Sequence, residues 1–142
     1  MKAKEYLEQA HYIDVRINSR IEQVEALHQL ATKATSTVSD LPGSPNRNVT
    51  RMEDVIIRIV EEEDLINQDI YRLVELKKEI RNVISQVKNP EYMALLELRY
   101  LCFRTWEQIS VEMDYGSRYV HTLHKKALEA VERLLADLPA SA

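Results

Sequence analysis

Apolar residues return every three or four positions between Lys4 and about Thr35. This spacing places them on one stripe of an α-helix, which turns once in about 3.6 residues. The stripe passes through one charged residue, Arg20, and Ile21 and Leu30 widen it. Its apolar members are Ile13, Ile17, Val24, Leu27, Ala31 and Ala34. We expect a long amphipathic helix over residues 4–35.

A second and longer stripe runs from Arg51 to about Val87 with the same alternating spacing. A sustained alternation of this kind is a heptad pattern. Its members are Met52, Ile56, Ile59, Glu63, Ile66, Ile70, Leu73, Lys77, Ile80, Ile84 and Val87. Two of them, Glu63 and Lys77, are polar. Either they fix the register or the oligomeric state of a buried seam, or their long side chains reach out to solvent.

Residues 36–50 separate these two stripes and contain two prolines and a glycine among cap-type residues. Such a composition predicts a loop. Two amphipathic helices joined by a loop pair most simply as an antiparallel, coiled-coil-like hairpin, which we expect over residues 1–88. The apolar residues Val60, Leu65, Val74 and Leu76 lie outside the second stripe. A third helix or a second copy of the chain could cover them, so we expect self-association, with a dimer favoured.

Three shorter helices are predicted after the hairpin. Asn89-Pro90 suits a helix start, because Asn is a good N-cap and Pro fits the first helical position. The helix that follows should run over residues 91–103. Thr105 to Gln108 reads as a capping box that begins a second, short helix ending near Met113. A turn over residues 114–117 then leads into a final helix that ends near Leu135.

Composition supports an all-α fold, because the chain of 142 residues has only 2 Gly and 4 Pro. No segment alternates apolar and polar residues as a strand does. No apolar run approaches the roughly 20 residues that span a bilayer, and the N-terminal segment does not resemble a signal peptide. The single cysteine, Cys102, lies in an apolar run, so we expect a buried free thiol and a cytoplasmic protein that does not bind membranes.

The layout of residues 89–138 is that of a helix-turn-helix domain, which lays its second helix in the major groove of DNA. Ile109 and Met113 should face inward from the short helix, and Val120, Leu123 and Ala127 from the last one. The last helix carries no acid from Gly116 to Leu128, within a chain whose net charge is −4. The candidate DNA-binding residues are Ser117, Arg118, Tyr119, His121, Thr122, Lys125 and Lys126. The alternative is a solvated helix face with this charge by chance.

The same segment resembles region four of bacterial sigma factors. The similarity rests on Leu98-Arg99-Tyr100, on the run from Trp106 to Met113 and on the run from Tyr115 to Leu128. The chain as a whole is similar to small phage and prophage proteins of Gram-positive bacteria, namely a streptococcal-phage family of unknown function, and to ArpU/RinA-type phage transcription regulators. Sigma-type domains usually have Ser or Thr where Gly116 stands, so Gly116 or Ser117 caps the last helix. The first 88 residues do not look like the region that binds core polymerase.

No catalytic or metal site emerges from the residue pattern. His121 and His124 lie three residues apart, but zinc needs more ligands than this pair supplies. The run Glu61-Glu62-Glu63-Asp64 is typical of a solvated helix face, and two glycines are too few for a phosphate-binding loop. We therefore expect no enzyme activity and no cofactor.

Three functions remain open at this point. The first is a phage-encoded transcriptional regulator that binds double-stranded DNA. The second is a small-terminase-like subunit of a phage DNA-packaging machine. The third is a protein-interaction module that docks on RNA polymerase without binding DNA, which the acidic balance of the chain favours.

Overall fold

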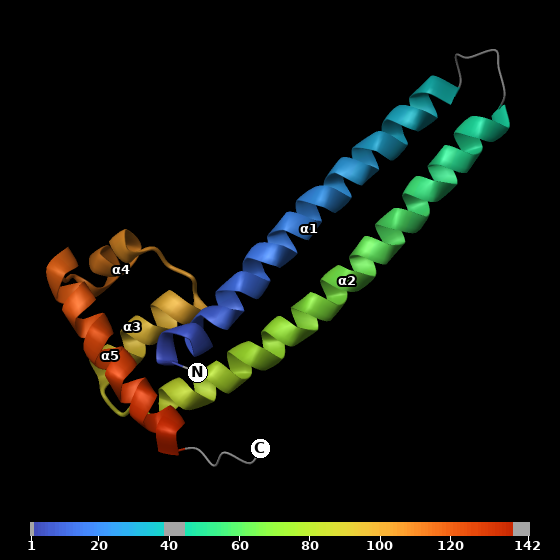
Figure 1. Ribbon diagram of the computed structural model, residues 1–142. Coiled ribbons are helices and arrows are strands. Elements are labelled where there is room, and N and C mark those ends of the chain that lie inside the picture. The colour runs from blue at the N-terminus through green and yellow to red at the C-terminus, as the bar shows by residue number, and fades with distance from the viewer. Residues whose placement is uncertain (1, 39–44, 138–142) are drawn as a thin grey trace. The chain divides into compact units, whose positions relative to one another are not determined.

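The computed structural model describes residues 2–38 and 45–137, which form helices and connecting turns and no strand. This confirms the all-α prediction. The elements are α1 (Ala3–Val38), α2 (Pro45–Ser85), α3 (Pro90–Leu96), the π-helix η1 (Glu97–Leu101), α4 (Trp106–Met113) and α5 (Ser117–Asp137) (Figure 1). The chain divides into two compact units, one of residues 2–13 with 73–137 and the other Asp14–Arg72.

The helices of the long segments extend further than the sequence pattern predicted. We expected a loop over residues 36–50, but α1 continues to Val38 and α2 begins at Pro45. Proline suits the first turn of a helix, because the N–H that it lacks would have no partner there. The rest of the predicted loop, residues 39–44, lies outside the described residues.

Within the unit Asp14–Arg72, segments of α1 and α2 lie side by side (Figure 1). The first stripe is confirmed where it is described in this unit, since Ile17 and Val24 are buried and Arg20, Leu27 and Ala31 half-buried. The second stripe is partly wrong. Ile59 and Ile66 are buried as predicted, but Ile56 and Ile70 are exposed.

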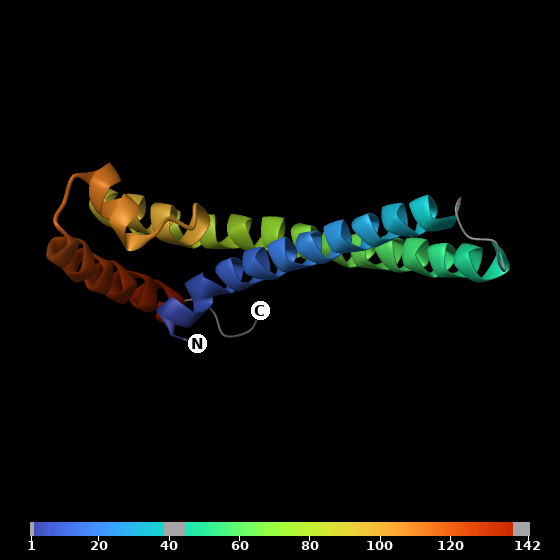
Figure 2. The same ribbon diagram turned by 90° about the horizontal axis from the view of Figure 1, so that it is seen from above.

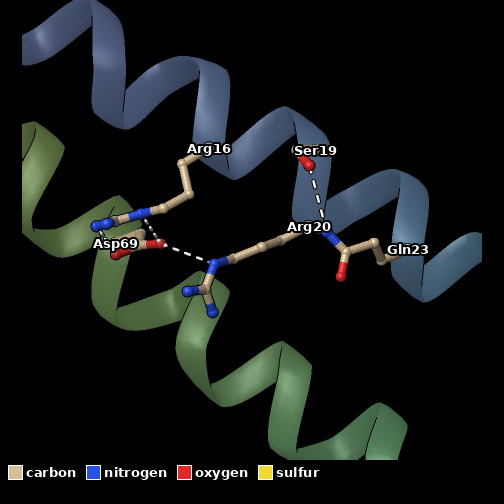
Figure 3. A network of polar contacts seen from close by, with 5 residues as sticks. All are labelled: Arg16, Ser19, Arg20, Gln23 and Asp69. Carbon is tan, nitrogen blue, oxygen red and sulfur yellow. Dashed lines mark hydrogen bonds and ion pairs between the residues drawn. The ribbon is translucent and has the colours of Figure 1, made fainter.

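The residue buried in place of Ile70 is its neighbour Asp69. Arg16 donates two hydrogen bonds to its carboxylate, Nε to Oδ2 at 3.1 Å and Nη2 to Oδ1 at 2.8 Å. Arg20 adds an ion pair, with Nε 3.4 Å from Oδ2, as Figure 3 shows. A buried carboxylate is tolerated when it is paired and hydrogen-bonded in this way. Counting apolar residues alone therefore selected the wrong neighbour.

Neither predicted polar member of the second stripe is buried. Glu63 is exposed, and its Oε1 lies 3.8 Å from Nε2 of His28 across the two helices. The half-buried Lys77 places its ammonium 4.6 Å from the centre of the Phe103 ring. Glu63 is thus exposed to solvent, as the second alternative describes. The ammonium of Lys77 instead lies on an aromatic face, which neither alternative describes.

The other unit is built around two apolar clusters. In the first, the N-terminal turns of α1 (Figure 2) bring Ala3 and Leu7 to Ile80 and Ile84 of α2 and to Val131 of α5. In the second, Leu95 of α3 packs with Ile109, Val120 and Leu123, which come from α4 and α5. These clusters fix α4 and α5 to the rest of the unit. The predicted inward positions Ile109, Val120, Leu123 and Ala127 are all buried, and Met113 packs against the second cluster.

The segment predicted as one helix over residues 91–103 is an α-helix up to Leu96 and a π-helix from Glu97. Asn89 caps α3 as expected, accepting hydrogen bonds from the N–H groups of Glu91 and Tyr92. From Glu97 the backbone widens into the π-helix, and Cys102 N donates to Glu97 O at 3.0 Å. Phe103 then turns the chain with a φ of 57°. As a result Cys102 is exposed, and the prediction of a buried thiol is wrong.

Candidate functional site

Helix α4 is short and fixed at both ends. The predicted capping box is present: Gln108 N donates to Thr105 Oγ1 at 3.2 Å, and Thr105 N donates to Gln108 Oε1 at 2.9 Å. At the other end Asp114 adopts a left-handed conformation with a φ of 58°. Both Tyr115 N and the Ser110 hydroxyl then bond across the turn, to Ser110 O and Tyr115 O respectively. These contacts hold the turn between α4 and α5.

Helix α5 begins directly after that turn. Val120 N donates to Gly116 O at 3.0 Å, so the carbonyl of Gly116 accepts the first bond of the helix and Gly116 occupies the cap position. The inner row of α5 is buried and consists of Val120, Leu123, Ala127 and Val131. Because this row anchors α5, the opposite side of the helix faces solvent in one fixed direction.

All seven residues predicted to bind DNA are exposed on α5: Ser117, Arg118, Tyr119, His121, Thr122, Lys125 and Lys126. Within this set, Arg118, Thr122 and Lys125 are spaced four and three residues apart and form the row opposite the buried one. The Thr122 hydroxyl donates to Arg118 O at 3.1 Å. The structure therefore brings a guanidinium, a hydroxyl and an ammonium to one face.

A carboxylate that the sequence pattern does not connect with this helix lies beside it. Glu91, in the first turn of α3, accepts hydrogen bonds at Oε2 from the hydroxyls of Tyr115 and Tyr119, both at 3.2 Å. The hydrogen bond to Glu91 and the charge of that carboxylate raise the pKa of Tyr119. The positive side of α5 is consequently bordered by one acid from a different helix. Nothing in the local spacing of residues 117–126 indicates it.

A cluster of aromatic side chains packs against α5 at His124. The Tyr100 hydroxyl lies 2.6 Å from Nε2 of His124, and Trp106 contacts the His124 ring edge-on at 4.5 Å between centroids. The Arg99 guanidinium stacks on Trp106 at 4.4 Å. Burial, followed by the charges of Arg99 and Lys4, lowers the pKa of His124 to about 4. His124 is therefore neutral at pH 7, and it packs α5 against Tyr100 and Trp106.

His121 and His124, which the sequence places three residues apart, have different surroundings. His121 is exposed and its ring lies 5.0 Å from that of Trp106, whereas His124 is half-buried against Tyr100. Among residues 2–38 and 45–137, no three His, Cys, Asp or Glu side chains gather as a metal site would require. In the same part of the chain, none of the helices combines the length and the apolar character needed to cross a bilayer.

Comparison with known proteins identifies a family but no characterised relative. Residues 40–132, which are more than half of the chain, match the family model described as "Protein of unknown function (DUF1492)". No curated protein matches the chain, and no solved structure does. The match confirms that part of the resemblance that pointed to a family of unknown function. The chain therefore belongs to the DUF1492 family.

Proposed function

We propose that the protein is a DNA-binding transcriptional regulator in which α4 and α5 form a sigma region-four-like helix-turn-helix. The observation that carries this proposal is the exposed row Arg118, Thr122 and Lys125 on α5. It lies opposite the buried row of the same helix, in a segment without acids from Gly116 to Leu128. An origin in phages of Gram-positive bacteria is part of the same proposal.

The anchoring of α5 supports a role as the recognition helix. Such a helix contacts base edges with residues near its N-terminal end, while the preceding helix braces it. Ser117 and Arg118 are the first two residues of α5, and the row continues through Thr122 to Lys125. Because Val120 and Leu123 are buried between these positions, the helix that carries the exposed side chains is anchored without a DNA partner.

The side chains of the row suit two kinds of contact. Arginine recognises guanine through two parallel hydrogen bonds in the major groove, and threonine hydroxyls bond to bases or phosphates. Lysines such as Lys125 and Lys126 neutralise phosphates and release counterions. We therefore assign sequence reading to Arg118 and Thr122, and phosphate binding to the two lysines.

Three cations on a chain of net charge −4 are few for tight DNA binding by one copy. Two copies would double the number of phosphate contacts, and affinity rises steeply with that number at low salt. The antiparallel segments of α1 and α2 that hold Asp69 and its arginines would form the hairpin through which copies associate. Duplex affinity is thus expected to depend on both salt and oligomeric state.

The proposal is tested by replacing two cations of the row in the full-length protein. Arg118→Ala with Lys125→Ala should lower affinity for duplex DNA by at least about tenfold and reduce the salt dependence by about two counterions. The matched control is Lys78→Ala with Arg81→Ala, which removes the same charge from exposed positions of α2. Fluorescence anisotropy of fragments selected from a random duplex library gives both quantities.

Two results contradict the regulator. If the wild-type protein selects no duplex at low salt and binds RNA polymerase core enzyme instead, it is the protein-interaction module that the net negative charge favours. If the α5 variant and the α2 control lose affinity equally, α5 is not the DNA-binding surface. A ring of many subunits in native mass spectrometry would assign the DNA binding to a small-terminase-like packaging subunit.

A further inference from the structure

A row of exposed residues, of which three are apolar and two polar, runs along α2 within the unit Asp14–Arg72. Its positions are spaced four and three residues apart and are Ile56, Val60, Glu63, Asn67 and Ile70. Ile56, Val60 and Ile70 are 49%, 61% and 42% exposed. Two further apolar residues, Ile57 and Tyr71, each follow a member of the row and are 54% and 68% exposed.

The positions of this row differ from the buried positions of α2, although one member, Glu63, also lies 3.8 Å from His28 of α1. The buried positions of α2 in this unit are Ile59, Ile66 and Asp69, and Asp69 bonds Arg16 of α1. Each buried position directly precedes a member of the exposed row, namely Val60, Asn67 or Ile70, so the two rows lie on adjacent faces of α2. Alternating spacings of four and three are the pattern of a helix-pairing seam. The α2 helix thus carries a second seam without a helix from this chain upon it in the described residues.

We infer that a second copy of this chain packs antiparallel along this row, across a two-fold axis near residue 65. In such a pair, residues at equal distances on either side of the axis face each other. Val60 and Ile70 lie five residues on either side of Leu65, and Glu63 and Asn67 lie two residues on either side. Val60 would therefore meet Ile70 of the second copy, and Glu63 would meet its Asn67.

The polar pair favours a second copy over an unrelated apolar helix, although Glu63 Oε1 already lies 3.8 Å from His28 Nε2 of its own chain. The Asn67 amide donates hydrogen bonds, and the second carboxylate oxygen of Glu63, Oε2, can accept one across the two-fold axis. An apolar partner would desolvate the Glu63 carboxylate and leave the Asn67 amide without a hydrogen-bonding group opposite it, at a cost in free energy. Next to the row, Ile57 and Tyr71 lie seven residues on either side of Asp64, which brings these two apolar residues together as well.

One contact opposes the association. Asp64 would lie near the two-fold axis and therefore face Asp64 of the second copy. Within each chain, Gln68 Nε2 donates a hydrogen bond to Asp64 Oδ2 at 3.0 Å. Like charges across a pair of helices are destabilising and are screened by salt. The dimer is accordingly expected to tighten as salt rises, which is opposite to the salt dependence of DNA binding. The inference does not rest on the proposed DNA-binding function, and its tests contain no DNA.

Sedimentation equilibrium of the full-length protein over a wide concentration range tests the interface. Val60→Glu should raise the dimer dissociation constant by at least about 100-fold, because the two-fold axis places each substitution in the interface twice. The matched control is Leu65→Glu, on the same helix but about half a turn away from the row, which should leave the constant within about threefold. Asp64→Asn should lower it several-fold.

Circular dichroism verifies that each variant keeps the helical content of the wild type. A monomeric wild-type protein at all concentrations overturns the inference, as do equal effects of Val60→Glu and Leu65→Glu. If Val60→Glu does not fold, the dimer dissociation constant of Asp64→Asn and its dependence on salt still test the inference. Weaker association of Asp64→Asn than of the wild type would contradict a two-fold axis near residue 65.

Distances between spin labels determine the direction of the pair. Cysteines are placed singly at the exposed positions Glu61 and Asp54 in a Cys102→Ser background. These sites differ by seven residues, so an axis near residue 65 makes the 54–54 distance longer than the 61–61 distance by about 21 Å along the helix, at 1.5 Å per residue. Equal distances would show a parallel pair and overturn the antiparallel assignment.

Discussion

Arg16 and Asp69 form a two-point contact between α1 and α2, with donor–acceptor distances of 2.8 and 3.1 Å. The Asp69 side chain is 8% exposed, whereas that of Arg16 is 46% exposed. The carboxylate has therefore lost its water and the guanidinium has not. This asymmetry predicts that the two ends of the contact respond differently to mutation.

Removing the arginines is predicted to cost far more stability than replacing the acid. Arg16→Ala with Arg20→Ala leaves the Asp69 carboxylate buried and unpaired, which should lower the free energy of unfolding by about 3 kcal/mol. Asp69→Leu places an apolar side chain at a buried position of α2 and frees both arginines to reach solvent. It should change stability by less than about 1 kcal/mol in either direction.

Urea unfolding of the three proteins, followed by circular dichroism, measures both effects. If the double-arginine variant and Asp69→Leu lose the same free energy of unfolding, the ion pair between the arginines and Asp69 governs stability, and not the cost of burying an unpaired acid. The Asp69→Leu variant also tests specificity, since a fully apolar seam permits other registers of the two helices.

The Asp69 contact also marks the limit of what could be predicted from the sequence. Periodicity predicted the long helices and identified Ile59 and Ile66, because a seven-residue repeat is visible without knowing the partner. It chose Ile70 over Asp69, because the burial of an acid depends on Arg16 and Arg20, which are about 50 residues away in sequence. Local signals performed best: the caps at Asn89 and Thr105 each depend on residues within four positions.

The candidate site divides in the same way. The exposed and buried positions of α5 were predicted from helical spacing alone, and Val120, Leu123 and Ala127 are buried as expected. Glu91 beside Tyr119 and Tyr100 beside His124 were missed, because each pair joins residues more than 20 positions apart. The packing of Ala3 and Leu7 into the same unit as α5 was missed for the same reason.

Stability is predicted to fall as the pH is lowered from about 6.5 to 4. The pKa of His124 is about 4 in the folded protein and near 6.5 when unfolded, so the unfolded state alone binds a proton in this window. The unfolded state is thereby favoured, and stability decreases as pH falls. Allowing for partial exposure of the ring, the loss should be on the order of 1–2 kcal/mol.

The contribution of His124 is isolated by His124→Gln, which keeps a hydrogen-bonding group for Tyr100 and does not titrate. Thermal melts between pH 4 and 7 should show a flatter profile for this variant. His121→Gln, at an exposed position of the same helix, serves as the control and should retain the wild-type slope. Parallel profiles for His124→Gln and the wild type would show that other groups cause the pH dependence.

Gly116→Ser is predicted to stabilise the protein slightly. Gly116 holds the cap position of α5, its φ is not positive, and a Cβ added to it meets nothing within 4 Å. A serine hydroxyl there can accept a hydrogen bond from the free N–H groups of the first turn, worth a few tenths of a kcal/mol over glycine. Differential scanning calorimetry should show a melting temperature about 1–3 °C higher.

The matched substitution is Gly116→Ala, which adds a Cβ without an acceptor and should lower the melting temperature, since alanine caps poorly. Changes of the same sign for both variants would mean that the hydroxyl does not cap α5.

Glu91→Gln is predicted to strengthen DNA binding, if α5 is the recognition helix. The substitution removes the one negative charge bonded to Tyr119 and retains an oxygen that accepts hydrogen bonds from the hydroxyls of Tyr115 and Tyr119. Less repulsion of phosphates should raise duplex affinity about two- to fivefold at low salt. Glu75→Gln removes the same charge from an exposed position of α2 and should leave affinity within about 1.5-fold. Anisotropy titrations at 50 and 200 mM salt should show the gain shrinking as salt rises, because screening weakens exposed charges. If duplex affinity rises equally for Glu91→Gln and Glu75→Gln, or if the increase persists at high salt, Glu91 does not lie beside the DNA-binding face.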